Sequence, residues 1–282
     1  MTIEWFPGHM AAARREAVKT MRKTDVVIEV LDARAPLSSC SPMFEELRRE
    51  NMRPALKVLN KVDAADPRRT QQWLDHYNAQ PKTKAIALCA TKAGEVARIP
   101  KACLELAPGR GTKLKPLRMM ILGIPNVGKS TLMNSLLRRH IANVGDEPAI
   151  TKMQGRHQLG PDMWIVDTPG MLWPRVDQEV ALKLAATHSI GRNAYDEETV
   201  ALELARILLR DYAGLLGERY GAVPNGCDPL GLLAHIARTR SIAADGVAKA
   251  AAVLLNDFRS GKLGRITLET VAPPIAAAEA AR

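Results

Sequence analysis

The sequence predicts an α/β fold with a doubly wound, mostly parallel sheet, followed by a smaller domain built only from helices. Three observations support this prediction. Short runs of Val, Ile and Leu alternate with helical patterns as far as residue 177. Beyond that point the strand-like runs disappear, and the length of 282 residues suits two domains. We therefore expect an α/β domain at residues 1–177 and a helical domain at residues 178–282.

The expected strands are apolar without polar alternation, which is typical of strands buried on both faces of a parallel sheet. They are Val26–Leu31, Ala55–Leu59, Ala85–Leu88, Leu117–Leu122 and Trp164–Val166. The helical patterns between them are Pro42–Glu50, Pro67–Asn78, Glu95–Leu106 and Lys129–Arg139. In the second domain the helical patterns are Glu179–His188, Glu197–Leu216, Pro229–Thr239 and Gly246–Phe258. The Ala- and Pro-rich tail after Thr270 is expected to fray.

The composition is that of a globular protein with a polyanionic partner. Apolar residues make up 46% and charged residues 25%, which excludes wholesale disorder, collagen-like repeats and coiled coil. The net charge of +10 favours nucleic acid or an anionic membrane as partner. The four scattered cysteines predict reduced thiols and exclude a zinc site of the usual spacing. No apolar run is long enough to span a membrane and no signal peptide is recognisable, so we expect a cytoplasmic protein.

The segment from Gly123 to Ser130 reads Gly-Ile-Pro-Asn-Val-Gly-Lys-Ser and matches the complete G-x-x-x-x-G-K-[ST] pattern of a phosphate-binding loop. It lies between an expected strand and an expected helix, which is the context that the pattern requires. We expect Lys129 to contact the β- and γ-phosphates of a nucleotide and the Ser130 hydroxyl to ligate Mg²⁺. The residues expected to bind the nucleotide in this segment are Asn126, Val127, Gly128, Lys129, Ser130 and Thr131.

A second phosphate-directed motif is Asp167-Thr-Pro-Gly170, directly after the expected strand Trp164–Val166. An aspartate at a strand end can hold the water shell of Mg²⁺, and the amide of Gly170 can contact a γ-phosphate. Between the two motifs, Thr151 offers a second hydroxyl to Mg²⁺; the alternative is an ordinary loop threonine.

The motif Asn60-Lys61-Val62-Asp63 follows the expected strand Ala55–Leu59 and indicates guanine. The Asp63 carboxylate can accept hydrogen bonds from N1–H and the 2-amino group of guanine, a donor pair that adenine lacks. After the next strand, Cys89-Ala90 has the form of the Ser-Ala loop that usually makes the second base contact, with Cys in place of Ser.

The order of these motifs is inverted. In an ordinary GTPase the phosphate loop comes first, whereas here Asn60 precedes Gly123 by 63 residues. A parallel sheet tolerates this order when the old termini are joined and the chain is opened elsewhere. Residues Pro108–Pro116 are rich in Gly, Pro and basic residues and fit the expected join. The sequence therefore predicts a circularly permuted P-loop GTPase domain.

Together these motifs resemble the YlqF/RbgA family of circularly permuted ribosome-biogenesis GTPases. The resemblance also rests on Trp5-Phe-Pro-Gly-His9-Met, Asp32-Ala-Arg-Ala-Pro36 and Pro148-Ala-Ile-Thr151. It implies a GTPase that acts on the large ribosomal subunit through a helical, RNA-binding C-terminal domain. Two positions depart from the family pattern: Ala149 replaces the usual Gly, which implies a stiffer loop, and Cys89 replaces the common Ser, which weakens one hydrogen bond.

Many GTPases place a water-orienting Gln directly after the Asp-x-x-Gly motif, but this chain has Met171 there. The resemblance implies the same apolar substitution, so the polar group must come from elsewhere. Mainly on the resemblance, we expect His9, in the Phe-Pro-Gly-His loop, to orient the water. The alternative is that Trp5, Phe6 and His9 only dock the N-terminal segment on the sheet. Asn126 is the residue type that helps to coordinate K⁺ in related GTPases, so we expect K⁺ to stimulate turnover.

Two functions are open at this point. The resemblance favours a GTP-hydrolysing switch, slow alone and stimulated by the ribosome, that binds the large subunit and its rRNA and promotes a late assembly step. In that switch, GTP orders the loops around Thr151 and Asp167, and residues Met171–Asp177 pass the nucleotide state to the helical domain. The alternative is a nucleotide-stabilised RNA-binding module, or another RNA-linked GTPase, in which hydrolysis is incidental. We expect GTP or GDP, Mg²⁺ and K⁺ as ligands, and a monomer without membrane or DNA partners.

The positive charge lies in one half of the chain. Residues 178–282 contain 12 Lys or Arg and 12 Asp or Glu, which leaves 28 and 18 for residues 1–177. The excess gathers at Arg14–Lys23, Arg110–Arg118 and Arg138-Arg139. We therefore expect the α/β half itself to lie against rRNA phosphates, with salt-sensitive affinity. Arg34 is either structural or RNA-facing, and the sequence leaves both alternatives open.

Overall fold

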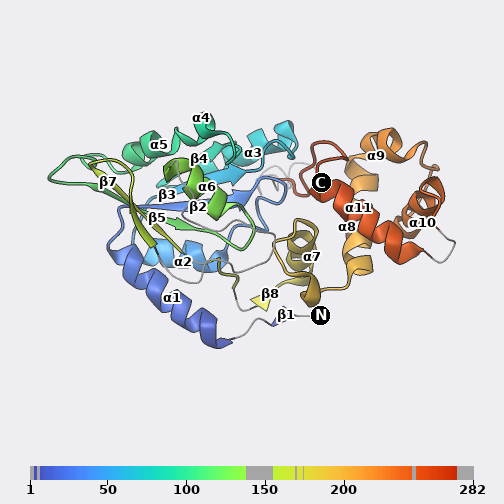
Figure 1. Cartoon of the computed structure of the whole chain (residues 1–282), viewed down its shortest axis with the longest axis horizontal. Coiled ribbons are helices and arrows are strands. Elements are labelled where there is room, and N and C mark those ends of the chain that lie inside the picture. The colour runs from blue at the N-terminus through green and yellow to red at the C-terminus, as the bar shows by residue number, and fades with distance from the viewer. Residues whose placement is uncertain are drawn as a thin grey trace, which may run out of the picture.

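The computed structural model describes residues 3–4, 7–137, 155–168, 170–173, 175–242 and 246–271. Its centre is a six-stranded sheet in the order β4-β3-β2-β5-β7-β6 (Figure 1). The strands are β2 (Val26–Asp32), β3 (Ala55–Asn60), β4 (Thr83–Ala87), β5 (Leu117–Leu122), β6 (Gly155–Gln158) and β7 (Met163–Asp167). All neighbours pair in parallel except β6, which is antiparallel to β7. The predicted α/β fold with a mostly parallel sheet is confirmed.

Helices cover both faces of this sheet. They are α1 (Pro7–Arg22), α2 (Pro42–Glu50), α3 (Pro67–Asn78), α4 (Ala93–Val96), α5 (Ile99–Leu106) and α6 (Lys129–Leu137). Successive residues of a strand point to opposite faces, so Val26, Ile28 and Val30 pack with α4, α5 and α6. Val27 and Leu31 lie on the other face, with α1 and α2 against the first and α3 against the second. The buried strands therefore read as continuous apolar runs, which made them recognisable in the sequence.

The structure contains elements of the α/β half that were not predicted, and one predicted helix is divided. Helix α1 was not predicted; its Pro7 lies in the first turn, where a proline loses no hydrogen bond. The pattern Glu95–Leu106 forms two helices, α4 and α5, instead of one. Strand β6 is short and alternates in burial, so it carries no apolar run.

A small second sheet ties the two ends of the α/β half together. Strand β1 (Ile3–Glu4) pairs antiparallel with β8 (Arg175–Val176). The segment ahead of α1 therefore runs beside the chain that follows the Asp-x-x-Gly motif (Figure 1).

The C-terminal half is helical, as predicted. Its elements are α7 (Gln178–Ala186), the short 3₁₀ helix η1 (Arg192–Ala194), α8 (Glu197–Asp211), α9 (Ala213–Tyr220), α10 (Pro229–Thr239) and α11 (Val247–Arg259). Helices α8 and α11 carry much of its core, through side chains such as Leu204, Leu208, Leu254 and Phe258. Among the residues that the structure describes, no helix combines the length and the apolar character needed to cross a membrane.

The predicted helix Glu197–Leu216 is divided at Tyr212. Tyr212 leaves helical geometry, with φ −138° and ψ 29°. Its hydroxyl lies 3.1 Å from an Asp66 carboxylate oxygen and accepts a hydrogen bond from the Thr267 amide at 3.1 Å. A contact between the two halves of the chain thus sets the break, and helix periodicity gives no sign of it.

After α11 the chain returns to the α/β half as an extended segment, residues 263–271, which we call the C-terminal strap. The Ile266 amide donates to the Ala64 carbonyl at 3.0 Å, and the Leu268 amide donates to the Arg34 carbonyl at 2.7 Å. The buried Glu269 carboxylate accepts from the Leu37 amide at 2.6 Å. The sequence analysis assigned no structure to this segment; residues 272–282, which include most of the tail expected to fray, lie outside the described residues.

Candidate nucleotide-binding site

The loops that carry the predicted motifs all follow the carboxyl ends of parallel strands. The Asn60 loop follows β3, Cys89-Ala90 follows β4, the phosphate loop follows β5 and Asp167 ends β7. The chain proceeds from β2 outward to β3 and β4, then returns across β2 to β5. Such a reversal of direction between two neighbouring strands opens a crevice at their carboxyl ends, where ligands of α/β proteins bind.

Two glycines let the phosphate loop pass close to its neighbours. Gly123 lies against β2, because a Cβ there would be 2.7 Å from the Val30 carbonyl oxygen. Gly128 has φ +98°, and a Cβ there would be 2.2 Å from Nδ2 of Asn60. Helix α6 begins directly after Gly128, at Lys129, so its first amides face the loop. This arrangement suits the phosphates of a nucleotide.

The Lys129 side chain is buried in the phosphate loop. Its Nζ donates to the Ile124 carbonyl at 2.7 Å. Burial lowers the pKa of Lys129 to about 8, against the opposing effect of the nearby Asp167 carboxylate. A Cβ on Gly170 would lie 3.0 Å from this Nζ, so the Asp-x-x-Gly segment approaches the lysine that is predicted to bind phosphate.

Asp167 offers a carboxylate oxygen suited to a cation. The residue is 4% exposed, and its Oδ1 is buried without a hydrogen-bond partner in the described part of the chain. Burial raises the pKa of Asp167, while the charge of Lys129 opposes the shift. A buried carboxylate oxygen of this kind and the hydroxyl of Ser130, in the first turn of α6, fit the hard oxygen ligands of Mg²⁺. Thr151, the third predicted ligand, lies outside the described residues.

Asn60 joins three loops of the site. Its Nδ2 donates to the Val127 carbonyl in the phosphate loop at 2.8 Å, and its Oδ1 accepts from the Ala90 amide at 2.9 Å. The adjacent Lys61 donates from Nζ to the Asn126 carbonyl at 2.6 Å. The predicted base-binding and phosphate-binding residues are therefore in direct contact.

The remaining base-directed residues lie at the rim of the site. Asp63 is exposed, and the described side chains leave its carboxylate without a hydrogen bond. Cys89 is buried, and its amide donates to a carboxylate oxygen of Glu95 at 2.7 Å. Its Sγ lies 3.1 Å from Oγ1 of Thr91. Val62 is half-buried and contributes its backbone carbonyl to a contact with the strap, described below.

The structure decides between the two alternatives for Arg34 in favour of a structural role. Arg34 is 3% exposed and binds Asp32 through two hydrogen bonds, from Nε at 2.9 Å and from Nη2 at 2.8 Å. Its guanidinium also lies 5.4 Å from the ring centre of Phe258 in α11. Asp32 receives a second cation, because Lys61 Nζ is 3.0 Å from Oδ2. This ion cluster holds Lys61, and with it the Asn60–Asp63 loop, against the end of β2.

The C-terminal strap also contacts the Asn60–Asp63 loop. This contact was not predicted from the sequence. Arg265 donates from Nη2 to the Val62 carbonyl at 2.8 Å and from Nε to the Ala65 carbonyl at 3.0 Å. With the Ile266 bond to Ala64, three backbone carbonyls around Asp63 are held by two strap residues. No motif marks the strap in the sequence, because most of these contacts are made by or to the backbone.

The residues expected to take part in hydrolysis are only partly placed. Met171 is 5% exposed and packs with Ala17 and Met21 of α1, so it is a core residue. His9 lies in the first turn of α1 and not in a loop, and its side chain is outside the described set. Asn126 has φ +58°, and its Nδ2 donates to the His188 carbonyl just after α7 at 2.8 Å.

Comparison with known proteins agrees with this geometry. The family profile "50S ribosome-binding GTPase" matches residues 118–209. The chain is 39% identical to "Ribosome biogenesis GTPase A" of Bacillus cereus, over 96% of this chain and 94% of that protein. It is 34% identical to "Mitochondrial ribosome-associated GTPase 1" of Mus musculus, over 94% of this chain and 89% of that protein.

A solved structure extends the agreement to the fold. The "GDP-bound structure of TM YlqF" superposes with a TM-score of 0.63 at 22% identity, over 91% of this chain and 99% of that one. On its sequence similarity to the bacterial proteins and on its permuted motif order, the chain belongs to the ribosome biogenesis GTPase A family.

Proposed function

We propose that this GTPase is a switch that binds the large ribosomal subunit, contacts its rRNA and promotes a late step of subunit assembly. The observation that carries the proposal is the pair of hydrogen bonds that Asn60 makes, donating to the Val127 carbonyl and accepting from the Ala90 amide, which join a guanine motif and a phosphate loop into one site. The names of the bacterial and mitochondrial relatives support the ribosome as partner. The proposed location is the cytoplasm and the proposed form is a monomer, with domains at residues 1–177 and 178–282.

Guanine recognition is assigned to Asp63. Its exposed carboxylate is free to accept from N1–H and the 2-amino group of the base. Replacing Asp63 with Asn adds a donor, which suits the 2-carbonyl of xanthine. We expect Asp63→Asn to reverse the preference from GTP to XTP, measured by competition with a fluorescent nucleotide; unchanged preference for GTP contradicts the assignment.

The phosphates and Mg²⁺ are assigned to the other end of the site. Lys129 and the amides from Asn126 to Thr131 would hold the phosphates, and the Gly170 amide would contact the γ-phosphate. Ser130, Asp167 and Thr151 would hold Mg²⁺, which neutralises charge on the phosphates when bound. Asp167→Ala is expected to abolish Mg²⁺-dependent tightening of GTP binding while leaving Mg²⁺-free GDP binding in place.

Hydrolysis requires a group other than Met171, whose side chain is in the core. We propose that His9 orients the attacking water. The pairing of β1 with β8 supports this, because it draws the N-terminal segment alongside the chain after Gly170. The alternative is that His9 only helps to dock this segment. The His9→Ala variant tests the two roles. Normal GTP binding with hydrolysis at less than a tenth of the normal rate supports the orienting role. A normal rate of hydrolysis supports the docking role.

A K⁺ ion between the phosphates is the proposed further activator, with Asn126 as its ligand. The amide nitrogen of Asn126 is already bonded to the His188 carbonyl, so the carbonyl oxygen Oδ1 is the group assigned to the ion. We expect faster turnover in K⁺ than in Na⁺ at equal ionic strength. Equal rates in the two salts contradict the assignment.

The nucleotide state would reach the C-terminal half by two routes. The chain passes from Gly170 to α7 within eight residues, and Asn126 of the phosphate loop binds the His188 carbonyl at the end of that helix. Sedimentation with large subunits tests the switch. Co-migration with a non-hydrolysable GTP analogue and release with GDP supports it, whereas equal binding in both states favours an RNA-binding module in which hydrolysis is incidental.

A further inference from the structure

The starts of four neighbouring strands form a basic row on the side of the sheet opposite the nucleotide site. Lys23 precedes β2, Arg53 precedes β3, Lys82 precedes β4 and Lys115 precedes β5, each by one to three residues. Because β4, β3, β2 and β5 are parallel neighbours, their amino ends lie side by side, with adjacent strands about 4.8 Å apart. We call these four residues the basic edge.

Backbone hydrogen bonds fix the segments of the basic edge against one another. The Ala55 amide donates to the Lys82 carbonyl at 2.9 Å, and the Val27 amide donates to the Pro54 carbonyl at 3.0 Å. The Asp25 amide donates to the Arg118 carbonyl at 2.8 Å. The backbone around Asp25, Pro54 and Lys82 is therefore held in register with the sheet.

Two acidic side chains near this edge, Asp25 and Glu45, are already paired with arginines. Asp25 binds Arg110 at 3.1 Å and Arg118 at 2.9 Å, and Glu45 binds Arg48 at 2.5 Å. In contrast, Lys23, Lys82 and Lys115 are exposed and have no acidic partner in the described part of the chain. The row ends at β7, where Asp162 holds the corresponding position. These three lysines thus lie at the end of the sheet opposite the loops of the nucleotide site.

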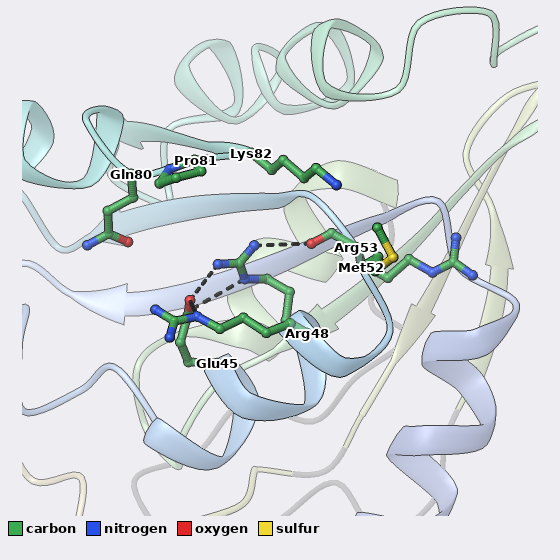
Figure 2. Close-up of a pocket in the computed structure, with 8 residues that line it drawn as sticks. Glu45, Arg48, Met52, Arg53, Gln80, Pro81 and Lys82 are labelled. Atoms are coloured by element: carbon green, nitrogen blue, oxygen red, sulfur yellow. Dashed lines mark hydrogen bonds and ion pairs between the residues drawn. The ribbon is translucent and has the colours of Figure 1, made fainter.

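A pocket of about 370 Å³ lies within this edge, between the end of α2 and the turn before β4 (Figure 2). Its lining residues are Glu45, Arg48, Arg49, Met52, Arg53, Gln80, Pro81 and Lys82. Arg53 donates from Nη2 to the Arg22 carbonyl at 2.9 Å, while its Nε is buried without a hydrogen-bond partner among the described residues. Lys82, at the rim of this pocket, is exposed and has no acidic partner among the described residues, so its ammonium group is the donor there that suits a phosphate oxygen.

Two exposed apolar side chains accompany the cations. Met52 is 72% exposed at the rim of the pocket, and Leu114 is 94% exposed between Lys113 and Lys115. Single apolar side chains among cations suit the sugars and bases of a nucleic acid. An amphipathic helix that binds a membrane presents a continuous apolar face, whereas these two residues lie in separate loops.

We infer that the basic edge binds the phosphate backbone of RNA, so that the nucleotide site and the C-terminal helices face away from the RNA bound there. The inference rests on the proposed function for the identity of the partner. It adds which surface makes the contact: the amino ends of β2 to β5, and not the loops around the nucleotide.

The test compares two triple charge reversals with equal change in net charge. The edge variant is Lys23→Glu/Lys82→Glu/Lys115→Glu. The control is Arg68→Glu/Arg192→Glu/Lys249→Glu, three exposed cations on other surfaces. Binding of each protein to large-subunit rRNA transcribed in vitro is measured from low to moderate salt, together with GDP affinity as a check of folding.

We expect the edge variant to bind RNA about 100-fold more weakly, with a salt dependence lowered by about two to three phosphate contacts. The control should lose about threefold or less, and both should bind GDP normally. Equal losses in both variants, or RNA binding by the edge variant at wild-type strength, overturn the inference and leave the proposed function standing. A wild-type protein that binds neither RNA nor large subunits refutes the proposed function. Binding to phosphatidylglycerol vesicles but not to RNA overturns RNA as the partner of the edge.

Discussion

The Asn60 side chain donates from Nδ2 to the Val127 carbonyl at 2.8 Å, and so joins the proposed base-binding loop to the proposed phosphate-binding loop. Gly128 permits this close approach, because a Cβ there would be 2.2 Å from the same nitrogen. In this permuted chain the two loops are 67 residues apart in the sequence, and the base loop comes first. Together with the bond from Lys61 to the Asn126 carbonyl, this contact fixes the two loops relative to each other.

Asn60→Ala is expected to weaken GDP and GTP binding about 10- to 100-fold. It removes two hydrogen bonds, to Val127 and from Ala90, each contributing about 0.5–1.5 kcal/mol. Titration with a fluorescent guanine nucleotide measures the loss. Asn51→Ala is the matched control, because Asn51 donates to the Leu47 carbonyl at the end of α2 and should leave nucleotide affinity unchanged. Equal affinities for the wild type and Asn60→Ala contradict the role.

Nucleotide affinity is expected to fall as the pH rises through about 8. Burial lowers the pKa of Lys129 to about 8 in the free protein, and a bound polyphosphate raises it again by opposite charge. Below pH 7 the lysine is charged in both states and affinity is level. Above pH 8 binding must take up a proton, so affinity declines by up to tenfold per pH unit.

Calorimetry between pH 7 and 8.5, in buffers of different ionisation enthalpy, counts the protons taken up on GDP binding. This range stays below the pH at which guanine itself loses its N1 proton. We expect the uptake to rise from near zero toward one proton. An affinity that is independent of pH across the range shows that Lys129 is charged throughout.

Arg265 is expected to act as a positioning residue for guanine recognition. Its two hydrogen bonds to the Val62 and Ala65 carbonyls hold the backbone on both sides of Asp63. Arg265→Gln should weaken GTP binding about 3- to 10-fold and narrow the preference for GTP over ITP, which lacks the 2-amino group that Asp63 would bind. Arg265→Lys should restore part of the preference.

Lys262→Gln serves as the control for Arg265, since Lys262 is an exposed residue just before the strap. A structural defect alone would lower GTP and ITP binding by the same factor. A GTP-to-ITP ratio that stays at the wild-type value in Arg265→Gln therefore excludes the positioning role.

Helices that begin at a local sequence signal, such as a proline or a capping aspartate, were predicted from the sequence. Helices α2, α3 and α10 have the predicted bounds, because Pro42, Pro67 and Pro229 occupy their first turns; Asp66 and Asp228 also cap the last two. The same proline signal at Pro7 starts α1, which was not predicted. The motifs of the nucleotide site were predictable for a related reason: each is a short segment with its own chemistry.

The missed features depend on contacts between distant residues. The break at Tyr212 follows from its bonds to Asp66 and Thr267, and the strap is held mainly by backbone groups. The basic edge was visible only as a charge excess in one half of the chain. Strand order was needed to bring Lys23, Arg53, Lys82 and Lys115 onto one side of the sheet.

Lys57 and Glu29 form a buried ion pair. Replacing only Lys57 is expected to destabilise the protein, whereas replacing both residues should leave most of its stability. Lys57 is 1% exposed and its Nζ lies 2.6 Å from Glu29 Oε2, beneath the loop that the strap covers. Lys57→Met should destabilise the protein by about 3–5 kcal/mol, because Glu29 keeps a buried charge without its closest cation. The double variant Lys57→Met/Glu29→Leu removes both charges and should recover most of that loss. Urea denaturation followed by circular dichroism measures both free energies of unfolding. A double variant no more stable than Lys57→Met would show that the lysine acts through its other neighbours, Cys40 at 3.1 Å and Glu45 at 3.7 Å.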